Sequence, residues 1–107
     1  MQQHEWEKAR EKIKLGENVT MNIDGYEVTL KPVKYNGFST AVLPFINGEY
    51  KSEWLTHNCE ERRRFYSARI EEYRGIGFVD CRAVWTSFEL MKSHFEKNNS
   101  SIELLKR

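Results

Sequence analysis

Three pairs of residues that join Asp or Asn to Gly constrain the fold of this 107-residue chain more than any other feature: Asp24-Gly25, Asn36-Gly37 and Asn47-Gly48. A two-residue hairpin turn of type I′ needs positive φ at both central residues, and such pairs adopt it readily. Between the turns, apolar and polar residues alternate with the period of a half-buried strand. The pattern predicts an antiparallel meander of four strands, over residues 19–23, 26–31, 38–46 and 49–55.

The third of these strands, 38–46, is nearly all apolar or small, which predicts that it is the most buried. Pro44 interrupts the run, and because proline lacks an N–H group it predicts a bulge or a strand end there. In the fourth strand the alternation places Tyr50, Ser52 and Trp54 on one face.

Helical spacing of apolar residues appears first in residues 4–15, where Trp6, Ala9 and Ile13 form a narrow stripe. Gly16 is placed to end this helix. A second helix is predicted after the meander, over 59–74, with Asn58 as its N-cap. Its apolar face would comprise Cys59, Tyr66, Ile70 and Tyr73, and Gly75 and Gly77 would end it.

A third helix is predicted to begin after Thr86, because Thr86 and Glu89 have the spacing of a capping box. Trp85 and Leu90 have the spacing of a hydrophobic staple. The buried stripe of this helix is predicted to be Phe88, Met91 and Phe95.

The order of these elements predicts one α+β domain spanning residues 1–107. We expect an antiparallel four-stranded meander sheet with three helices packed on one face. A possible fifth, C-terminal strand at 102–105 would lie at an edge of the sheet, where it could pair with a second copy of the chain.

The charge balance excludes some functions. The chain has 17 Lys and Arg against 16 Asp and Glu, a net charge of +1, and no one-signed block. A strong non-specific nucleic-acid binder needs a clear excess of cations and is therefore disfavoured. The N-terminal residues lack the apolar core of a secretory signal, and no apolar run is long enough to span a membrane. Two cysteines are too few for a disulfide framework, so we expect a soluble protein of a reducing cytoplasm.

The stretch NCEERRRFYSARIEEYRG, residues 58–75, supports two interpretations. On a helical wheel Arg62 and Arg63 flank the apolar stripe and Arg64 points away, so the three do not converge on one phosphate. In the structural interpretation their stems cover the rim of the core and nearby glutamates balance their charge. In the functional interpretation they contact a partner, because arginine is enriched at interface hot spots, and Arg62, Arg69 and Arg82 would line one edge.

Candidate chemical sites are weak. His57, Cys59, Cys81 and His94 are residue types that bind zinc, but they lack the local ligand pairs of structural zinc sites. No motif for a nucleophile elbow, a phosphate loop or a zinc protease is present. We therefore expect no enzymatic activity, no metal and no cofactor.

Aromatic residues on the predicted strands suggest an alternative function. They could stack the bases of single-stranded nucleic acid, with lysines beside them, or they could simply form the core. The residues concerned are Tyr26, Phe38, Tyr50 and Trp54, with Lys31, Lys34 and Lys51.

Four segments resemble a group of small proteins encoded in bacteriophages and prophages: DGYEVTLKPVKYNG, INGEYKSEWL, NCEERRRFY and WTSFELMKSHFEKNNSSIELL. The likeness covers most of the chain in the same order. In those relatives the stretch before the last segment is longer and richer in lysine than RGIGFVDCRA is here. The resemblance implies a setting in the cytoplasm of a bacterial host, and it implies no activity.

The resulting expectation is a small accessory protein of phage or prophage origin that binds a host or phage protein, or itself. The alternative is a nucleic-acid-binding accessory protein that uses the sheet aromatics and lysines. The residues predicted to contact a partner are Arg62, Arg63, Arg64, Lys51, Glu53 and Trp54.

Overall fold

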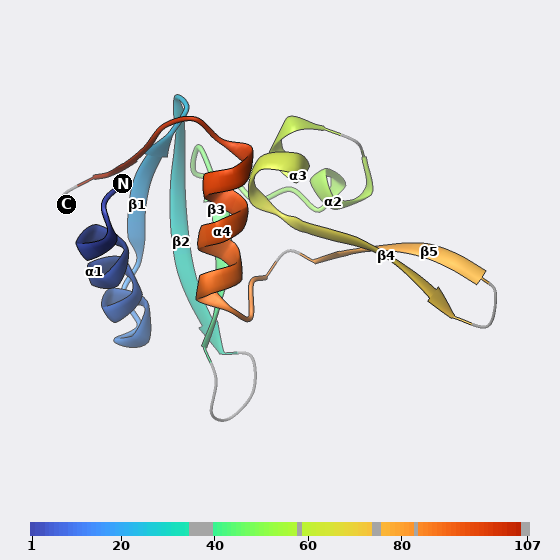
Figure 1. Cartoon of the computed structure of the whole chain (residues 1–107), viewed down its shortest axis with the longest axis horizontal. Helices are drawn as coiled ribbons and strands as arrows, with labels where there is room; N and C mark the ends of the chain where they lie inside the picture. The colour runs from blue at the N-terminus through green and yellow to red at the C-terminus, as the bar shows by residue number, and fades with distance from the viewer. Residues whose placement is uncertain (35–39, 58, 74–75, 83, 106–107) are drawn as a thin grey trace.

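The computed structural model describes residues 1–34, 40–57, 59–73, 76–82 and 84–105, with the two strands over 67–82 described by their backbone. The fold is α+β, as predicted (Figure 1). The helices are α1 (Gln3–Lys14), α2 (Glu53–Thr56), α3 (Glu60–Phe65) and α4 (Phe88–Asn98). The strands are β1 (Val19–Ile23), β2 (Tyr26–Lys34), β3 (Thr40–Ile46), β4 (Ser67–Tyr73), β5 (Ile76–Arg82) and β6 (Ile102–Leu104).

The main sheet has four antiparallel strands in the order β3-β2-β1-β6. The turn between β1 and β2 has φ values of 49° at Asp24 and 91° at Gly25, and the turn after β3 has 51° at Asn47 and 80° at Gly48. Both hairpin signals are therefore confirmed, whereas Asn36-Gly37 lies outside the described residues. The C-terminal strand is also confirmed, since β6 pairs with β1 from Ile23 opposite Ile102 to Met21 opposite Leu104.

The predicted fourth strand of the meander, 49–55, is wrong. Only Glu49 pairs with Ile46, by a pair of backbone hydrogen bonds that close the turn, and the chain then enters the short helix α2. The rings of Tyr50 and Trp54 both pack on Tyr66, and the Tyr50 ring also packs on Phe45 of β3. The fourth strand of the sheet is therefore β6, from the other end of the chain.

Strand β3 is an edge strand, and Pro44 lies in it without a bulge. Its pairing with β2 runs in unbroken register from Ile46 opposite Val28 to Thr40 opposite Lys34. The predicted interruption at Pro44 is therefore wrong. An edge strand tolerates a proline because the missing N–H faces away from the neighbouring strand.

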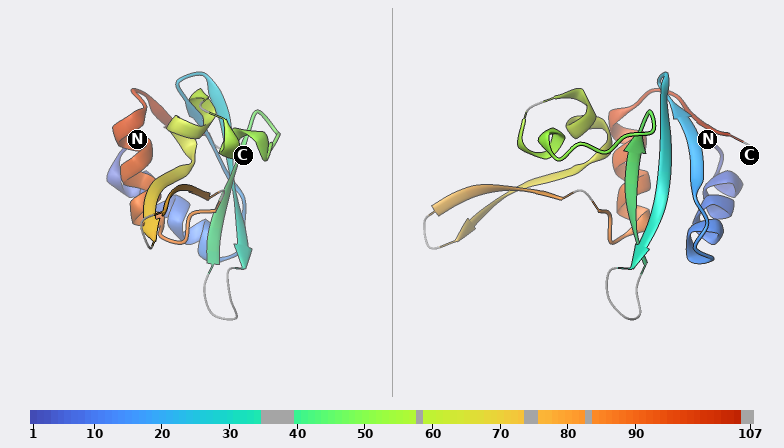
Figure 2. Two further views of the ribbon diagram at one scale, coloured as in Figure 1. Left: turned by 90° about the vertical axis from the view of Figure 1, so that its right-hand side faces the viewer. Right: turned by 180° about the vertical axis from the view of Figure 1, so that it is seen from behind.

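Helices α1 and α4 cover one face of the main sheet, as the side view in Figure 2 shows. The buried residues of α1 are those predicted, Trp6, Ala9 and Ile13. On α4, Met91 and Phe95 are buried as predicted, whereas Phe88 is only half-buried. They pack on the inward residues of the sheet, among them Val19, Met21, Ile23, Val28 and Leu30. The N-cap of α4 is Ser87, one residue later than predicted, and Leu90 is 65% exposed, so the predicted staple does not bury it.

The predicted helix over 59–74 is half wrong. Helix α3 ends at Phe65, and Tyr66 has extended backbone angles of φ −121° and ψ 150°. Tyr66 is buried, and its hydroxyl donates a 2.7 Å hydrogen bond to the carbonyl of Pro44. This anchor directs the chain into β4, which pairs with β5. The described residues thus contain four helices instead of three, and the one-face packing holds for α1 and α4.

Candidate functional site

Strands β4 and β5 form a two-stranded ribbon that projects from the body of the protein (Figures 1 and 2). Its pairing runs from Ser67 opposite Arg82 to Tyr73 opposite Ile76. The ribbon contacts the body of the protein chiefly at α2 and α3. The radius of gyration is 14.1 Å, against about 13 Å for a compact domain of this size. Among the described strands neither β4 nor β5 has a second neighbour, so the ribbon presents two strand edges.

Three of the predicted contact residues lie together at the base of the ribbon. Lys51 and Glu53 are exposed, and Trp54 is half-buried. The Trp54 ring packs on Tyr66 with centroids 6.1 Å apart, and the Lys51 ammonium lies 6.0 Å from the centre of the Trp54 ring. Trp54 and Glu53 also line a shallow pocket of about 260 Å³ between α2 and α3, with His57, Cys59 and Glu61.

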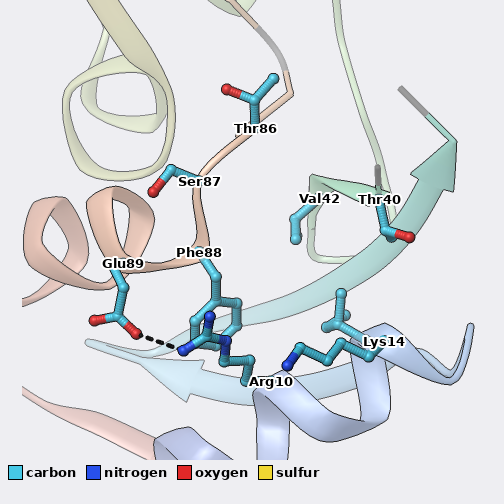
Figure 3. A pocket seen from close by; sticks show the side chains of 9 residues that line it. Arg10, Lys14, Thr40, Val42, Thr86, Ser87, Phe88 and Glu89 are labelled. Carbon is cyan, nitrogen blue, oxygen red and sulfur yellow. Dashed lines mark hydrogen bonds and ion pairs between the residues drawn. The ribbon is translucent and has the colours of Figure 1, made fainter. Parts of the chain in front are cut away.

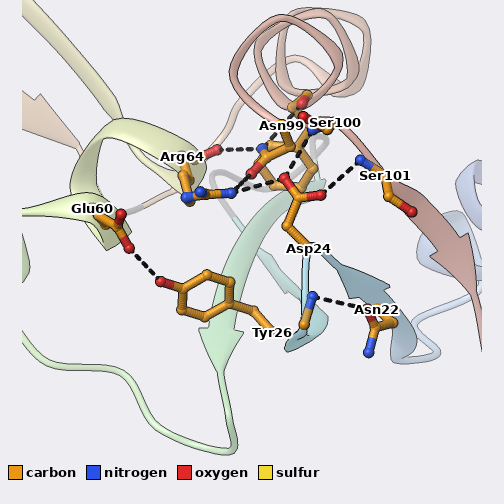
Figure 4. A network of polar contacts seen from close by, with 10 residues as sticks. Asn22, Asp24, Tyr26, Glu60, Arg64, Asn99, Ser100 and Ser101 are labelled. Carbon is orange, nitrogen blue, oxygen red and sulfur yellow. Dashed lines mark hydrogen bonds and ion pairs between the residues drawn. The ribbon is translucent and has the colours of Figure 1, made fainter.

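The three consecutive arginines separate into different environments. Arg63 is exposed and Arg62 is half-buried, on the surface of α3. Arg64 is the one that turns to the body, where its Nη1 donates to the carboxylate of Asp24 at 2.8 Å and to the Asn99 side-chain oxygen at 2.9 Å (Figure 4). Its guanidinium also lies 5.5 Å from the centre of the Tyr26 ring. The structure therefore gives Arg64 a stabilising role, and leaves Arg62 and Arg63 on the surface beside the ribbon.

Asp24 is the centre of this network, and sequence reasoning assigned it only a turn. Its two carboxylate oxygens accept hydrogen bonds of 2.8 Å from the backbone N–H groups of Ser100 and Ser101 (Figure 4). These bonds and the neighbouring Arg64 favour the ionised form, so the pKa of Asp24 lies below its ordinary value. The network joins the β1–β2 turn, the end of α3 and the segment after α4.

Two further titrating groups near α3 are held by structural contacts. The Tyr26 hydroxyl donates to the Glu60 carboxylate at 2.7 Å, which raises the pKa of Tyr26 because the ionised phenol would face a negative charge. His94 Nε2 donates to the carbonyl of Arg63 at 2.9 Å, and the imidazole packs 5.1 Å from Trp85. Partial burial of the imidazole lowers the pKa of His94.

The pKa shifts of Asp24 and His94 predict a loss of stability in acid. The ordinary pKa of His94 is 6.5 and that of Asp24 is 3.8, and both are lower in the folded chain. At a pH below the ordinary pKa, the group is protonated in the unfolded chain but still unprotonated in the folded chain, so acid favours unfolding. The free energy of unfolding that the group contributes is fully lost once the pH has fallen below the folded pKa. We expect the free energy of unfolding, measured by urea denaturation, to fall in two stages, below about pH 6.5 and again below about pH 3.8.

The variant His94→Gln separates the two stages, because glutamine keeps a donor for the carbonyl of Arg63 and does not titrate. The first stage should shrink in this variant and the second should persist. An unchanged first stage would show that another group causes it.

The aromatic residues considered as a stacking platform do not share a face of the sheet. Tyr26 packs on buried Phe65, with centroids 5.3 Å apart, while Tyr50 and Trp54 both pack on Tyr66 and lie outside the sheet. Phe38 lies outside the described residues. The outward face of β2 and β3 instead holds Lys31, whose ammonium lies 4.1 Å from the centre of the Phe45 ring.

Within the described part of the chain, no three His, Cys, Asp or Glu side chains gather closely enough to hold a metal ion. Of the zinc-type residues, Cys59 donates its thiol to the Trp54 carbonyl at 3.7 Å, and His94 lies against Trp85. The side chain of Cys81 is outside the described set. None of the described helices has the length and apolar character needed to cross a bilayer.

Comparison of the chain with models of known families, with curated proteins and with solved structures found no match in any of the three. The phage setting therefore stays a prediction from the sequence segments. The geometry identifies the ribbon and the adjoining surfaces of α2 and α3 as the candidate functional site.

Proposed function

We propose that this chain is a non-enzymatic binding module whose partner is another protein. The ribbon β4–β5 and the exposed residues of α2 and α3 would make the contact. The observation that carries the proposal is a two-stranded ribbon that projects from the body of the protein, with two strand edges that no other described strand covers (Figure 1).

The energetics of a two-stranded ribbon support a docking role. An isolated hairpin of two strands is marginally stable in water, because it buries little apolar surface. A partner that adds a strand to one edge would satisfy the backbone groups there, as in strand addition to exposed sheet edges. Apolar residues occupy alternate register positions of the ribbon, at Ala68 opposite Cys81 and Ile70 opposite Val79.

The charge at the base of the ribbon favours a protein partner over nucleic acid. Lys51, Glu53, Arg62 and Arg63 mix both signs on one side of the molecule, and the chain as a whole carries +1. Phosphate backbones select surfaces with a clear cationic excess, whereas protein interfaces use mixed charges around aromatic and arginine contacts. The resemblance to phage-encoded proteins supports a bacterial host as the setting, with a host protein, a phage protein or a second copy as the partner.

The pKa shifts also support a binding role over catalysis. Among the side chains that the structure describes, the groups with displaced pKa values are Asp24, Tyr26, Tyr66 and His94. Each makes a hydrogen bond that ties two parts of the fold together. Hydrogen bonds cause the shifts of the pKa of Asp24 and Tyr26, and burial causes those of Tyr66 and His94, so each shift has a structural cause.

The experiment is affinity capture from a bacterial lysate with the tagged chain, with and without nuclease. We expect a protein that is retained after nuclease treatment, and we expect the double variant Arg62→Glu/Arg63→Glu to retain at least about fivefold less of it. Arg64 must stay unchanged in this test, because its loss would weaken the fold and imitate a loss of binding. Lys8→Glu, an exposed charge reversal on α1, is the control.

If the captured protein is lost after nuclease treatment, the result would contradict the proposal and favour the nucleic-acid alternative. Size-exclusion chromatography of the purified chain separates a second copy from other partners, because self-association would appear without lysate.

A further inference from the structure

A cavity lies away from the ribbon, between α1, the start of β3 and the start of α4 (Figure 3). Its volume is about 560 Å³, within the range of pockets that hold small molecules. Its wall combines an apolar part with charged and hydroxyl side chains: Ile13, Val42 and Phe88, then Arg10, Lys14, Glu89, Thr40, Thr86 and Ser87.

Two cations from successive turns of α1 face this cavity. Arg10 and Lys14 are four residues apart, so they lie on the same side of the helix. Figure 3 shows both side chains extending toward the space beside Phe88. Arg10 forms an ion pair of 3.3 Å with Glu89, and the two side chains are 47% and 61% exposed. An exposed pair of this kind contributes little free energy, so an anionic ligand can displace Glu89 from Arg10.

The apolar surface that the wall offers to an organic body comes from Phe88. Phe88 is half-buried, whereas Ile13 and Val42 lie behind it in the core, at 4% and 2% exposure. A smaller cavity of about 60 Å³ adjoins the first and shares Arg10, Phe88 and Glu89 with it. Trp6 also lines this smaller cavity, and its buried indole N–H has no acceptor among the described residues. A buried donor of this kind normally meets an acceptor from water or a ligand.

We propose that the cavity binds a small phosphate monoester. The phosphate would lie between Arg10 and Lys14, and the organic part would pack on the ring of Phe88. A phosphate monoester carries nearly two negative charges at neutral pH and several strong acceptor oxygens, which match two cations and neighbouring hydroxyl donors. This site is separate from the protein contact proposed for the ribbon, and neither proposal depends on the other.

The test is an NMR titration of the full chain with adenosine 5′-monophosphate as the probe and adenosine as its uncharged counterpart. Saturable shifts with the nucleotide are expected at the backbone amides around Thr40, Thr86 and Ser87. Adenosine should bind at least about tenfold more weakly than the nucleotide. Glucose 6-phosphate serves as a second phosphate monoester with a different body.

Three substitutions of exposed residues are expected to change the affinity for the nucleotide in different ways. Lys14→Gln should weaken binding of the nucleotide about fivefold, and Glu89→Gln should tighten it by a similar factor because it releases Arg10. Lys8→Gln removes the same charge as Lys14→Gln from the same helix but does not line the cavity, so it should leave binding unchanged.

The proposal is overturned if neither phosphate monoester gives saturable shifts up to about 10 mM. It is also overturned if Lys8→Gln weakens binding as much as Lys14→Gln, because the attraction would then come from net charge alone. A Glu89→Gln variant that binds the nucleotide no more tightly would contradict the placement of the phosphate beside Arg10.

Discussion

Replacing Phe65 with alanine is expected to lower the free energy of unfolding by about 4 kcal/mol, the largest effect of any single substitution considered. Phe65 is fully buried, and its ring packs edge-to-face on Tyr26 at 5.3 Å and on Phe95 at 5.8 Å. It is the last residue of α3, and its carbonyl accepts a 2.9 Å hydrogen bond from the indole of Trp85. Removing the ring would leave a cavity where the main sheet, α3 and α4 meet.

Urea denaturation measures this effect, and Phe45→Ala is the matched control. Phe45 is half-buried on the outward face of β3, where its main contacts are Lys31 and Tyr50. Its replacement should cost roughly 1 kcal/mol, because less apolar surface is exposed and no closed cavity forms. An equal decrease in the free energy of unfolding for the two variants would contradict the placement of Phe65 where the main sheet, α3 and α4 meet.

Replacing Arg64 with alanine is expected to lower the free energy of unfolding by about 2 kcal/mol, because it removes charge-assisted hydrogen bonds from a half-buried network. The loss affects three parts of the chain at once, since Arg64 bonds to Asp24 and Asn99 and also lies over Tyr26. Thermal melting should shift downward by several degrees.

Arg62→Ala is the matched control, since it removes the same side chain from the same short helix. We expect it to change the free energy of unfolding by less than about 0.5 kcal/mol, as for other surface substitutions. A double-mutant cycle with Asp24→Asn should show coupling to Arg64 and none to Arg62. Equal effects of the two alanine substitutions would contradict the network.

The elements predicted correctly are those specified by local pattern. Asp24-Gly25 and Asn47-Gly48 adopt the positive φ values that their turns require. The stripe of α1 is buried as its spacing predicts, and so are Met91 and Phe95 of the α4 stripe. The class of the fold follows from these elements and from β6.

The sequence predicts a single helix over 59–74, which is wrong after Phe65, because the apolar residues of this stretch fit both the helical and the strand period. Cys59, Tyr66 and Ile70 match helical spacing, while Ala68 and Ile70 also alternate as in a strand. Tyr66 decides between them, through burial and a hydrogen bond to Pro44, a residue far away in the sequence. Such a contact has no local signature.

The same limit applies to the arginines and to the cavity. Arg64 was placed on the solvent side of a long helix, but its partner Asp24 lies 40 residues earlier in the chain. The cavity wall likewise combines α1, β3 and α4, and its only local signal is the spacing of Arg10 and Lys14. Tertiary contacts, which the sequence pattern does not encode locally, bring these groups together.

The most direct test of the proposed binding function compares the full chain with one whose ribbon is shortened. Residues 70–79 would be replaced by Asn-Gly, because Arg69 and Asp80 are opposite partners that a two-residue turn can join. The shortening leaves unchanged the core residues whose side chains the structure describes, among them Phe65, Tyr66 and Trp85, and we expect the shortened chain to melt cooperatively near the temperature of the full chain. We expect it to retain at least about tenfold less of the nuclease-resistant partner in affinity capture. Equal capture by a folded, shortened chain would contradict the role of the ribbon.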